Sequence, residues 1–205
     1  SAAVAAGALA AAAVLGGALL VGAALPASLA RLVDERLGPV ENAISGQVPF
    51  TVELATRLAR ELQAEAPGAT VWPAWIAGGS CRARGASAGR VQVLGAALPG
   101  LEVQPGRCVL GAELARVLGA SAGAELEVWI GEAAGRGVSP LPAATRAPQA
   151  ARLKVARVAL EAESASLFAL EPSQRPPRNC WMNREELAAL ASRPGGATHL
   201  FVQGA

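Results

Sequence analysis

Few side chains in this chain could carry out catalysis. It contains one histidine, His199, one aspartate, Asp34, one lysine, Lys154, and no tyrosine. A Ser–His–Asp triad would require His199 and Asp34, which lie far apart in the sequence, to meet at one serine. His199 lies within the apolar run Thr198–Val202, a setting typical of a strand residue with a satisfied imidazole. The histidine therefore gives no support to a catalytic site.

Carboxylate pairs are the remaining candidates for acid–base chemistry. Glu161 and Glu163 form one pair, and Glu185 and Glu186 form another. Two carboxylates can act as general acid and general base when their environments differ. Glutamates at strand ends and helix starts, however, are usually only solvated. We therefore expect no enzymatic activity. An exported enzyme that uses carboxylates is a hypothesis ranked third, after the two given at the end of this section.

Three cysteines could form covalent links: Cys81, Cys108 and Cys180. None belongs to a C-x-x-C pair, whereas zinc needs three or four ligands at short spacings, so we expect no metal. Outside the cytoplasm cysteines can pair, and three of them allow three different single bridges, each leaving a free thiol. Alternatively, all three are small buried hydrophobic residues. We favour the pair Cys108–Cys180, because the two hold equivalent positions in similar stretches of sequence.

The charge distribution bears on partners. The formal net charge is +2, and the 18 basic residues are spread along the chain. A nucleic-acid-binding protein would gather them on a stripe or tail, so we expect no nucleic acid partner. The chain also lacks a G-x-x-x-x-G-K-[ST] loop, which cradles nucleotide phosphates. We expect no cofactor on this chain.

The first 30 residues are uncharged, and the first charge is at Arg31. The apolar stretch Ala2–Leu25, about 24 residues at about 1.5 Å each, reaches roughly 36 Å, more than a hydrocarbon core of about 30 Å. We therefore predict a transmembrane helix over 1–30. Small residues within it would allow close packing against other helices. The alternative is a secretory signal peptide cleaved near Ala27–Ala30, although the apolar stretch is long for one and no basic n-region precedes it.

Beyond the apolar stretch, spacings of three to four residues predict an amphipathic helical extension over 31–47. The apolar positions of this stripe are Leu29, Leu32, Val33, Leu37, Val40 and Ile44. Pro39 would bend or end the helix.

Residues 48–205 read as one α+β domain with a mixed sheet and short helices. We expect helices over Val52–Ala66, capped by Thr51, over Ala112–Leu118, closed by Gly119, and after Asn183, which with Glu186 resembles a capping box. We expect strands over Thr70–Ala77, Arg90–Leu94, Cys108–Leu110, Ala124–Ile130, Arg152–Ala159 and Thr198–Val202. The stretch Gly78–Gly89 would connect two strands, and 132–150 would be a mobile insertion.

One strand-into-helix unit occurs twice. The sequence from Cys180 through Leu190 repeats the pattern of Cys108–Leu118, with a cysteine and apolar residues leading into a leucine- and alanine-rich helix.

These elements resemble a known family. The pattern Val109-Leu110-Gly111-x-Glu113-Leu114-Ala115-x-x-Leu118-Gly119, then Gly123-x-x-Leu126-x-Val128, resembles the extracytoplasmic domain of FtsX-like (MacB-like) ABC transporter permeases. The stretch Phe168-x-Leu170-x-Pro172-Ser173-Gln174-x-Pro176-Pro177-x-Asn179, before Trp181-Met182, is similar to a subgroup with long periplasmic domains. Ala124 departs from the family, which usually has aspartate after the glycine.

The resemblance implies a permease fragment in a bacterial inner membrane, with most of the chain extracytoplasmic. It implies further spans beyond Ala205, a homo- or heterodimer of permeases, and a cytoplasmic ATP-binding subunit as the partner that binds ATP. ATP-driven movement would pass through Pro26–Ile44 to a substrate or periplasmic partner. The alternative is a membrane-anchored or secreted periplasmic protein-binding module with no role in transport.

Overall fold

The computed structural model describes residues 33–131, 149–171, 173 and 175–204, with ten further positions between 7 and 31. Every described position from Gly7 to Leu37 is helical. No helix formed by the described residues is both long enough and apolar enough to cross a membrane. Most of the predicted transmembrane segment, 1–30, lies outside the described residues.

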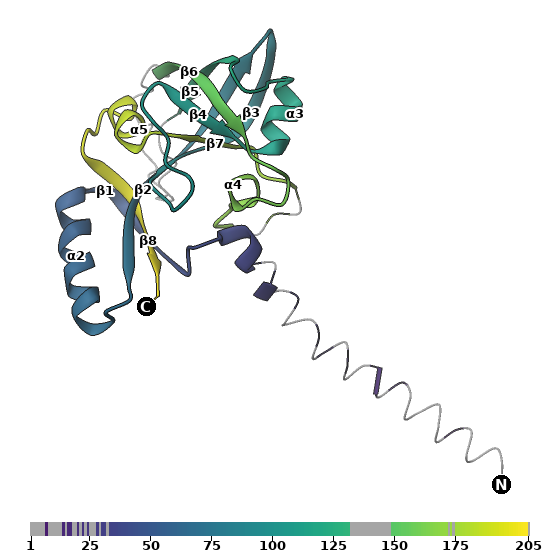
Figure 1. The fold of residues 1–205 in the computed structure, drawn as a ribbon, viewed down its shortest axis with the longest axis vertical. Coiled ribbons are helices and arrows are strands. Elements are labelled where there is room, and N and C mark those ends of the chain that lie inside the picture. The colour runs from purple at the N-terminus through teal and green to yellow at the C-terminus, as the bar shows by residue number, and fades with distance from the viewer. Residues whose placement is uncertain are drawn as a thin grey trace, which may run out of the picture.

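A mixed sheet organises the described part of the domain (Figure 1), which confirms the α+β class. Its strands run in the order β1-β8-β2-β3-β7-β4-β6-β5. They are β1 (Asn42–Thr51), β2 (Thr70–Ala83), β3 (Ala86–Ala96), β4 (Arg107–Leu110), β5 (Glu125–Ile130), β6 (Gln149–Val158), β7 (Asn179–Met182) and β8 (Gly196–Gln203). The helices of the domain are α2 (Val52–Glu65), α3 (Ala112–Leu118), α4 (Ser164–Leu167) and α5 (Arg184–Leu190).

The long strand β2 belongs to two parts of the sheet. Its first half, Thr70–Ala74, pairs with β8, which in turn pairs with β1 to form a three-stranded extension. Its second half pairs with β5 over Gly79–Arg82. This second pairing closes β2, β3, β7, β4, β6 and β5 into a six-stranded barrel.

Two hydrophobic cores follow from this arrangement. One fills the barrel, with Leu110, Leu114, Leu118 and Leu126 among its buried side chains. The other lies between the barrel, the extension and α4, and is centred on three aromatic rings. Phe168 packs edge-on against Trp181, and its ring centroid lies 5.3 Å from those of both Trp181 and Phe201.

The repeated strand-into-helix unit is confirmed. The first copy is β4 followed by α3, which ends at Gly119 in the left-handed region with φ 59°. The second is β7 followed by α5, and β4 and β7 are antiparallel neighbours in the barrel. The Asn183 amide oxygen accepts from the backbone N–H groups of Glu185 and Glu186 at 3.0 and 3.3 Å. Glu186 accepts a bond from the Gly106 N–H at 2.8 Å.

The expected connection Gly78–Gly89 was wrong. β2 continues to Ala83 and β3 starts at Ala86, so only Arg84 and Gly85 turn the chain, with φ of 48° and 84°. Positive φ at both central residues defines the hairpin turn that matches strand twist. Position 79 of β2 requires glycine, because a Cβ there would lie 2.3 Å from the Trp129 carbonyl oxygen of β5. Gly79 therefore allows β5 to approach β2 closely enough to close the barrel.

Other boundaries also shift. The helix over Val52–Glu65 is confirmed, with Thr51 at its N-cap position but without a side-chain capping bond. β1 begins at Asn42, within the range 31–47 expected to be helical. The predicted insertion 132–150 lies outside the described residues, except for Gln149 and Ala150 in β6.

Candidate functional site

The junction between the N-terminal helix and the domain is a fixed turn. The helix ends at Leu37, and the Gly38 N–H donates to the Asp34 carbonyl at 2.9 Å. Gly38 has φ 58°, and a Cβ on it would lie 2.8 Å from the Cβ of Ser164 in α4. Only glycine combines this backbone conformation with so close an approach. The turn is therefore seated directly on α4.

Side chains on both sides of this turn tie it to the domain. The Arg36 guanidinium donates to the Ser173 carbonyl at 3.0 Å. Leu37 packs against the aromatic core, and Val40 is 2% exposed within it. Contacts at Arg36, Leu37, Gly38 and Val40 thus hold the end of the helix. A change in the direction of the helix would therefore displace α4 and the core around Trp181.

The chain enters and leaves the domain at one place. The Glu41 N–H donates to the Val202 carbonyl at 2.9 Å, and the Gly204 N–H donates to the Glu41 carboxylate at 3.0 Å. Asn42 and Val202 are register partners where β1 and β8 meet. Both ends of the domain are therefore connected by hydrogen bonds, next to the helix junction.

A buried asparagine connects α4 to the repeated units. Asn179 is fully buried, and its amide nitrogen donates to the carbonyl groups of Ala165, Ser166 and Phe168 at 2.9–3.3 Å. Its backbone carbonyl accepts from the Gly111 N–H at 2.8 Å. Sequence reasoning placed Asn179 in a family-like stretch but assigned it no role, because its partners become neighbours only in the folded chain.

The three cysteines meet inside the barrel. Cys81, Cys108 and Cys180 come from β2, β4 and β7, and all are free and buried. The Cys108 and Cys81 thiols, together with burial, raise the pKa of Cys180 well above its ordinary value. Cys108 faces Met182 and Cys180 faces Leu110, so Cys108 and Cys180 are diagonal neighbours. The three thiols are free in this structure, and the pairing of Cys108 with Cys180 stays a prediction.

His199 lies in the middle of the three-stranded extension. It faces Ser45 of β1 and Ala74 of β2 in register, and its Nδ1 lies 2.9 Å from the Thr198 hydroxyl. Burial lowers the pKa of the imidazole below its ordinary value of 6.5. The ring centroid lies 6.3 Å from that of Phe201. These contacts give His199 the structural setting expected from its apolar run.

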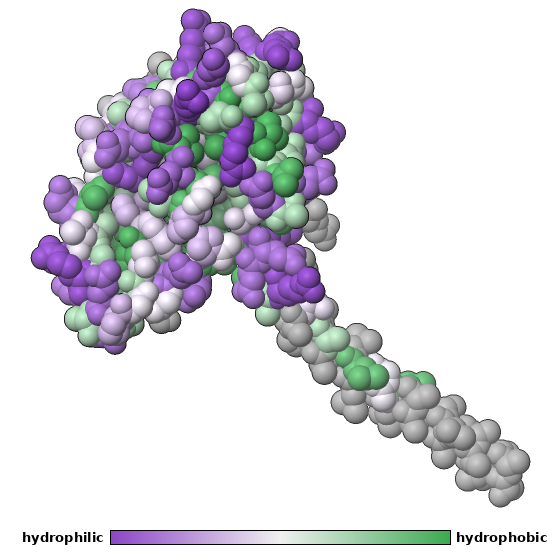
Figure 2. Space-filling model, viewed as in Figure 1, coloured by the Kyte–Doolittle hydropathy of each residue, from purple (hydrophilic) through white to green (hydrophobic). Residues whose placement is uncertain are grey.

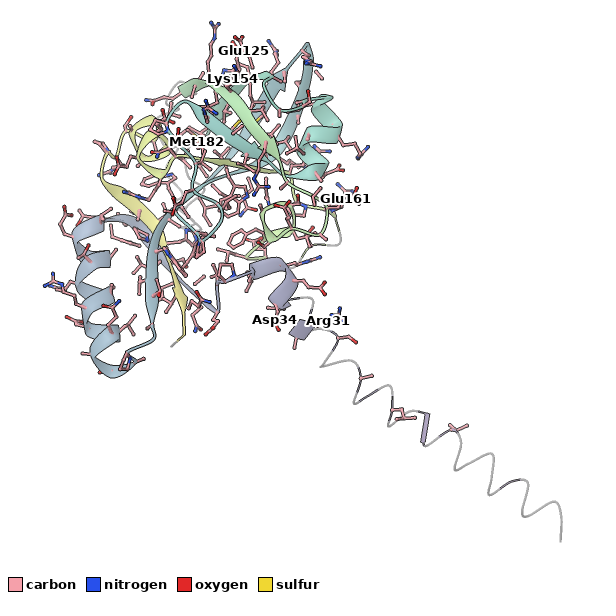
Figure 3. The ribbon with its side chains drawn as sticks, in the orientation of Figure 1. Arg31, Asp34, Glu125, Lys154, Glu161 and Met182 are labelled. Atoms are coloured by element: carbon pink, nitrogen blue, oxygen red, sulfur yellow. The ribbon has the colours of Figure 1, made fainter. Side chains whose placement is uncertain are left out.

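The four glutamates considered for acid–base chemistry take separate roles. Glu163 accepts from Arg157 at 2.6 Å and from the Leu160 N–H at 2.9 Å, and these two bonds, the Leu160 one foremost, lower its pKa. Glu161 is exposed (Figure 3). Glu185 pairs with Arg184 at 3.3 Å, whereas Glu186 binds Gly106. Within the described ranges, no three His, Cys, Asp or Glu residues form a group that could hold a metal ion.

The chain is similar to several solved structures. No protein-family model matches the sequence, and no curated protein matches it. The chain is similar to the crystal structure of the periplasmic region of MacB from Actinobacillus actinomycetemcomitans, with a TM-score of 0.45 and 11% identity. The match covers 79% of this chain and 66% of that one, so this chain spans just under two thirds of the length of that structure.

Proposed function

We propose that this chain is the N-terminal membrane helix and extracytoplasmic domain of an FtsX-like (MacB-like) ABC transporter permease in a bacterial inner membrane. A cytoplasmic ATP-binding subunit would supply the energy, and the permeases would act as a dimer. The domain would pass ATP-driven movement on to a substrate or periplasmic partner. The observation that carries this proposal is the junction, where the helix end is seated on α4 and both ends of the domain are hydrogen-bonded together.

The junction suits mechanical transmission for a physical reason. Coupling between distant sites needs packed elements that move as units, because flexible linkers absorb displacement. Here the Gly38 turn leaves no room for a flexible linker between helix and domain. A tilt of the helix would therefore rotate the domain as a rigid body.

Exposed apolar side chains support a helix that inserts in lipid. Val14 and Leu20 are 72% and 73% exposed. The described, coloured positions of the N-terminal segment lie away from the domain (Figure 2). Apolar side chains exposed along a helix favour a lipid or protein environment over water.

The residues of the family-like pattern also take up a consistent arrangement. Val109 and Leu110 lie in β4, Glu113 to Leu118 lie in α3, and Gly119 ends the helix in the left-handed region. Gly123, with φ 86°, turns the chain into β5. This local agreement supports the resemblance without identifying a substrate.

A topology experiment tests the proposal. We expect the full chain, expressed with its natural flanking sequence, to stay in the membrane fraction after alkaline carbonate extraction. Alkaline phosphatase fused after Gly204 should be active, since that enzyme needs the oxidising periplasm. A green fluorescent protein at the same position is the matched control and should be dark when exported by the general secretory route. A mature polypeptide that starts near Arg31 and is released into solution would overturn the proposal in favour of the secreted binding module.

A further inference from the structure

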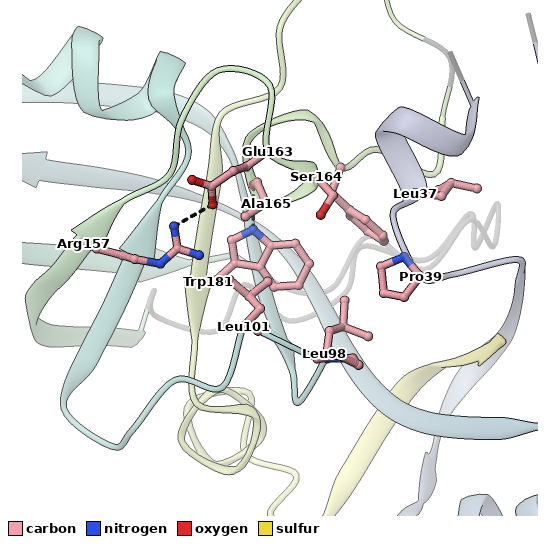
Figure 4. Close-up of a pocket in the computed structure, with 12 residues that line it drawn as sticks. Leu37, Pro39, Leu98, Leu101, Arg157, Glu163, Ser164, Ala165 and Trp181 are labelled. Carbon is pink, nitrogen blue, oxygen red and sulfur yellow. Dashed lines mark hydrogen bonds and ion pairs between the residues drawn. The ribbon is translucent and has the colours of Figure 1, made fainter. Parts of the chain in front are cut away.

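A pocket lies beside the junction, framed by segments from four parts of the chain (Figure 4). Leu37 and Pro39 come from the junction, and Trp181 comes from β7. The connection from β3 to β4 forms another wall, and Arg157 to Phe168 complete the frame. Trp181 and Phe168 border the pocket, and because each is 1% exposed, both are held in the aromatic core.

The walls of the pocket are held in place by hydrogen bonds. The Trp181 indole donates to the Ala165 carbonyl at 2.8 Å. The Leu101 N–H donates to the Leu98 carbonyl at 2.9 Å across a turn in which Gly100 has φ 73°. A cavity with fixed walls keeps its shape before a ligand arrives, which lowers the cost of binding.

The size of the pocket limits the ligand. Its volume is about 200 Å³. An apolar cavity of about 150 Å³ accepts benzene, whereas drug-sized sites occupy about 300–1,000 Å³. The pocket therefore suits one aromatic ring or a short alkyl chain with a small polar group.

The polar side chains of the pocket determine which charge the polar group of the ligand should carry. Arg157 donates to Glu163 through Nη1 at 2.6 Å, and the other Glu163 oxygen accepts from the Leu160 N–H. In the part of the chain that the structure describes, the remaining N–H groups of Arg157 make no hydrogen bond, and 42% of its side chain is exposed. The pocket thus offers free donors from a cation, while its carboxylate is already engaged on both oxygens.

From these contacts we propose that the pocket binds a small aryl- or alkyl-carboxylate. The apolar body would lie against the half-buried Leu37 and Pro39, beside the buried wall formed by Trp181, Leu98 and Leu101. The carboxylate would accept hydrogen bonds from Arg157. A planar guanidinium is well matched to a carboxylate, and such charge-assisted bonds are the strong ones. This site goes beyond the proposed transport role and does not depend on it.

Fluorine NMR of the full chain tests this site. The chain contains four tryptophans, so labelling with 5-fluorotryptophan gives four resonances, which Trp→Phe variants assign. The protein is kept in mild detergent micelles, which do not require a membrane-spanning helix, and the probe is 3-phenylpropanoate. We expect a saturable shift of the Trp181 resonance, with no comparable shift at Trp129, whose ring is covered by the Arg82 guanidinium on the barrel.

Charge and position are tested separately. Arg157→Gln should weaken binding of the probe about tenfold, because the variant loses a charge-assisted hydrogen bond to the carboxylate. Arg152→Gln is the matched control, because Arg152 lies in the same strand and pairs with Glu127 outside the pocket, and it should leave affinity unchanged. The amine analogue 3-phenylpropylamine should bind at least tenfold more weakly than the acid.

A pocket-filling variant, Leu98→Trp, should abolish the shift. Should it fail to fold, Arg157→Gln, with a half-exposed side chain, still decides the question. The proposal is overturned by the absence of a saturable Trp181 shift, by equal affinities for acid and amine, or by equal effects of Arg157→Gln and Arg152→Gln.

Discussion

At the scale of single residues, only one of the two carboxylate oxygens of Glu186 accepts a hydrogen bond from the described residues. One oxygen accepts from the Gly106 N–H at 2.8 Å, and the other is buried without a hydrogen-bond partner within the described residues. Glu186→Gln keeps an acceptor for Gly106 and removes the charge, so we expect unchanged or slightly higher stability. Glu186→Ala removes the acceptor and should cost about 1 kcal/mol. Thermal or denaturant unfolding of the two variants measures this difference, and equal losses would contradict it.

His199 predicts a pH dependence. Because burial disfavours the imidazolium, the folded-state pKa lies below the ordinary value of 6.5. Well above pH 6.5, the imidazole is mostly neutral in both the folded and the unfolded state. As pH falls, the unfolded chain binds the proton first, so stability decreases until the pH passes the folded pKa. We expect the wild-type chain to lose more stability between about pH 7 and 5.5 than His199→Gln, as measured by unfolding midpoints. Parallel curves for the two proteins would exclude this role.

At the scale of elements, two glycines provide a matched test of the junction. Gly38 and Gly119 have φ of 58° and 59°, but only a Cβ at Gly38 would contact another residue, Ser164 at 2.8 Å. Alanine at Gly119 should cost about 1 kcal/mol, the penalty of the left-handed conformation. Alanine at Gly38 should cost about 2 kcal/mol more, because the turn must move off α4. Similar midpoint shifts for the two variants would show that the turn is not seated on α4.

At the scale of the whole molecule, the helix and domain should move together. Leu37→Pro removes a helical hydrogen bond and clashes with the preceding turn, so in the assembled transporter we expect transport to be lost while the ATP-binding subunit still hydrolyses ATP. Leu37→Ala, which keeps the helix and removes packing, should retain most transport. Unchanged transport in Leu37→Pro would remove the coupling hypothesis.

Elements defined by nearby residues could be predicted from the sequence. The unit from Cys108 to Gly119 was predicted with nearly its observed bounds, because a buried strand, a leucine stripe and a left-handed glycine are local signals. The same holds for β5, where Leu126, Val128 and Ile130 alternate with more exposed residues. The second unit was recognised as a repeat for the same reason.

Features that depend on distant partners were decided only by the tertiary structure. Gly78–Gly89 was taken for a connection because glycine disfavours strands, yet barrel closure requires glycine where β5 approaches β2. β1 starts within a stretch of helical periodicity because it pairs with β8, far along the chain. The meeting of the three cysteines and the bonds that Asn179 donates to the carbonyl groups around α4 also depend on residues that are far apart in the sequence. The local sequence determines which backbone conformations have a low free energy. Burial and hydrogen bonds with residues that only folding brings together then decide which of these conformations forms.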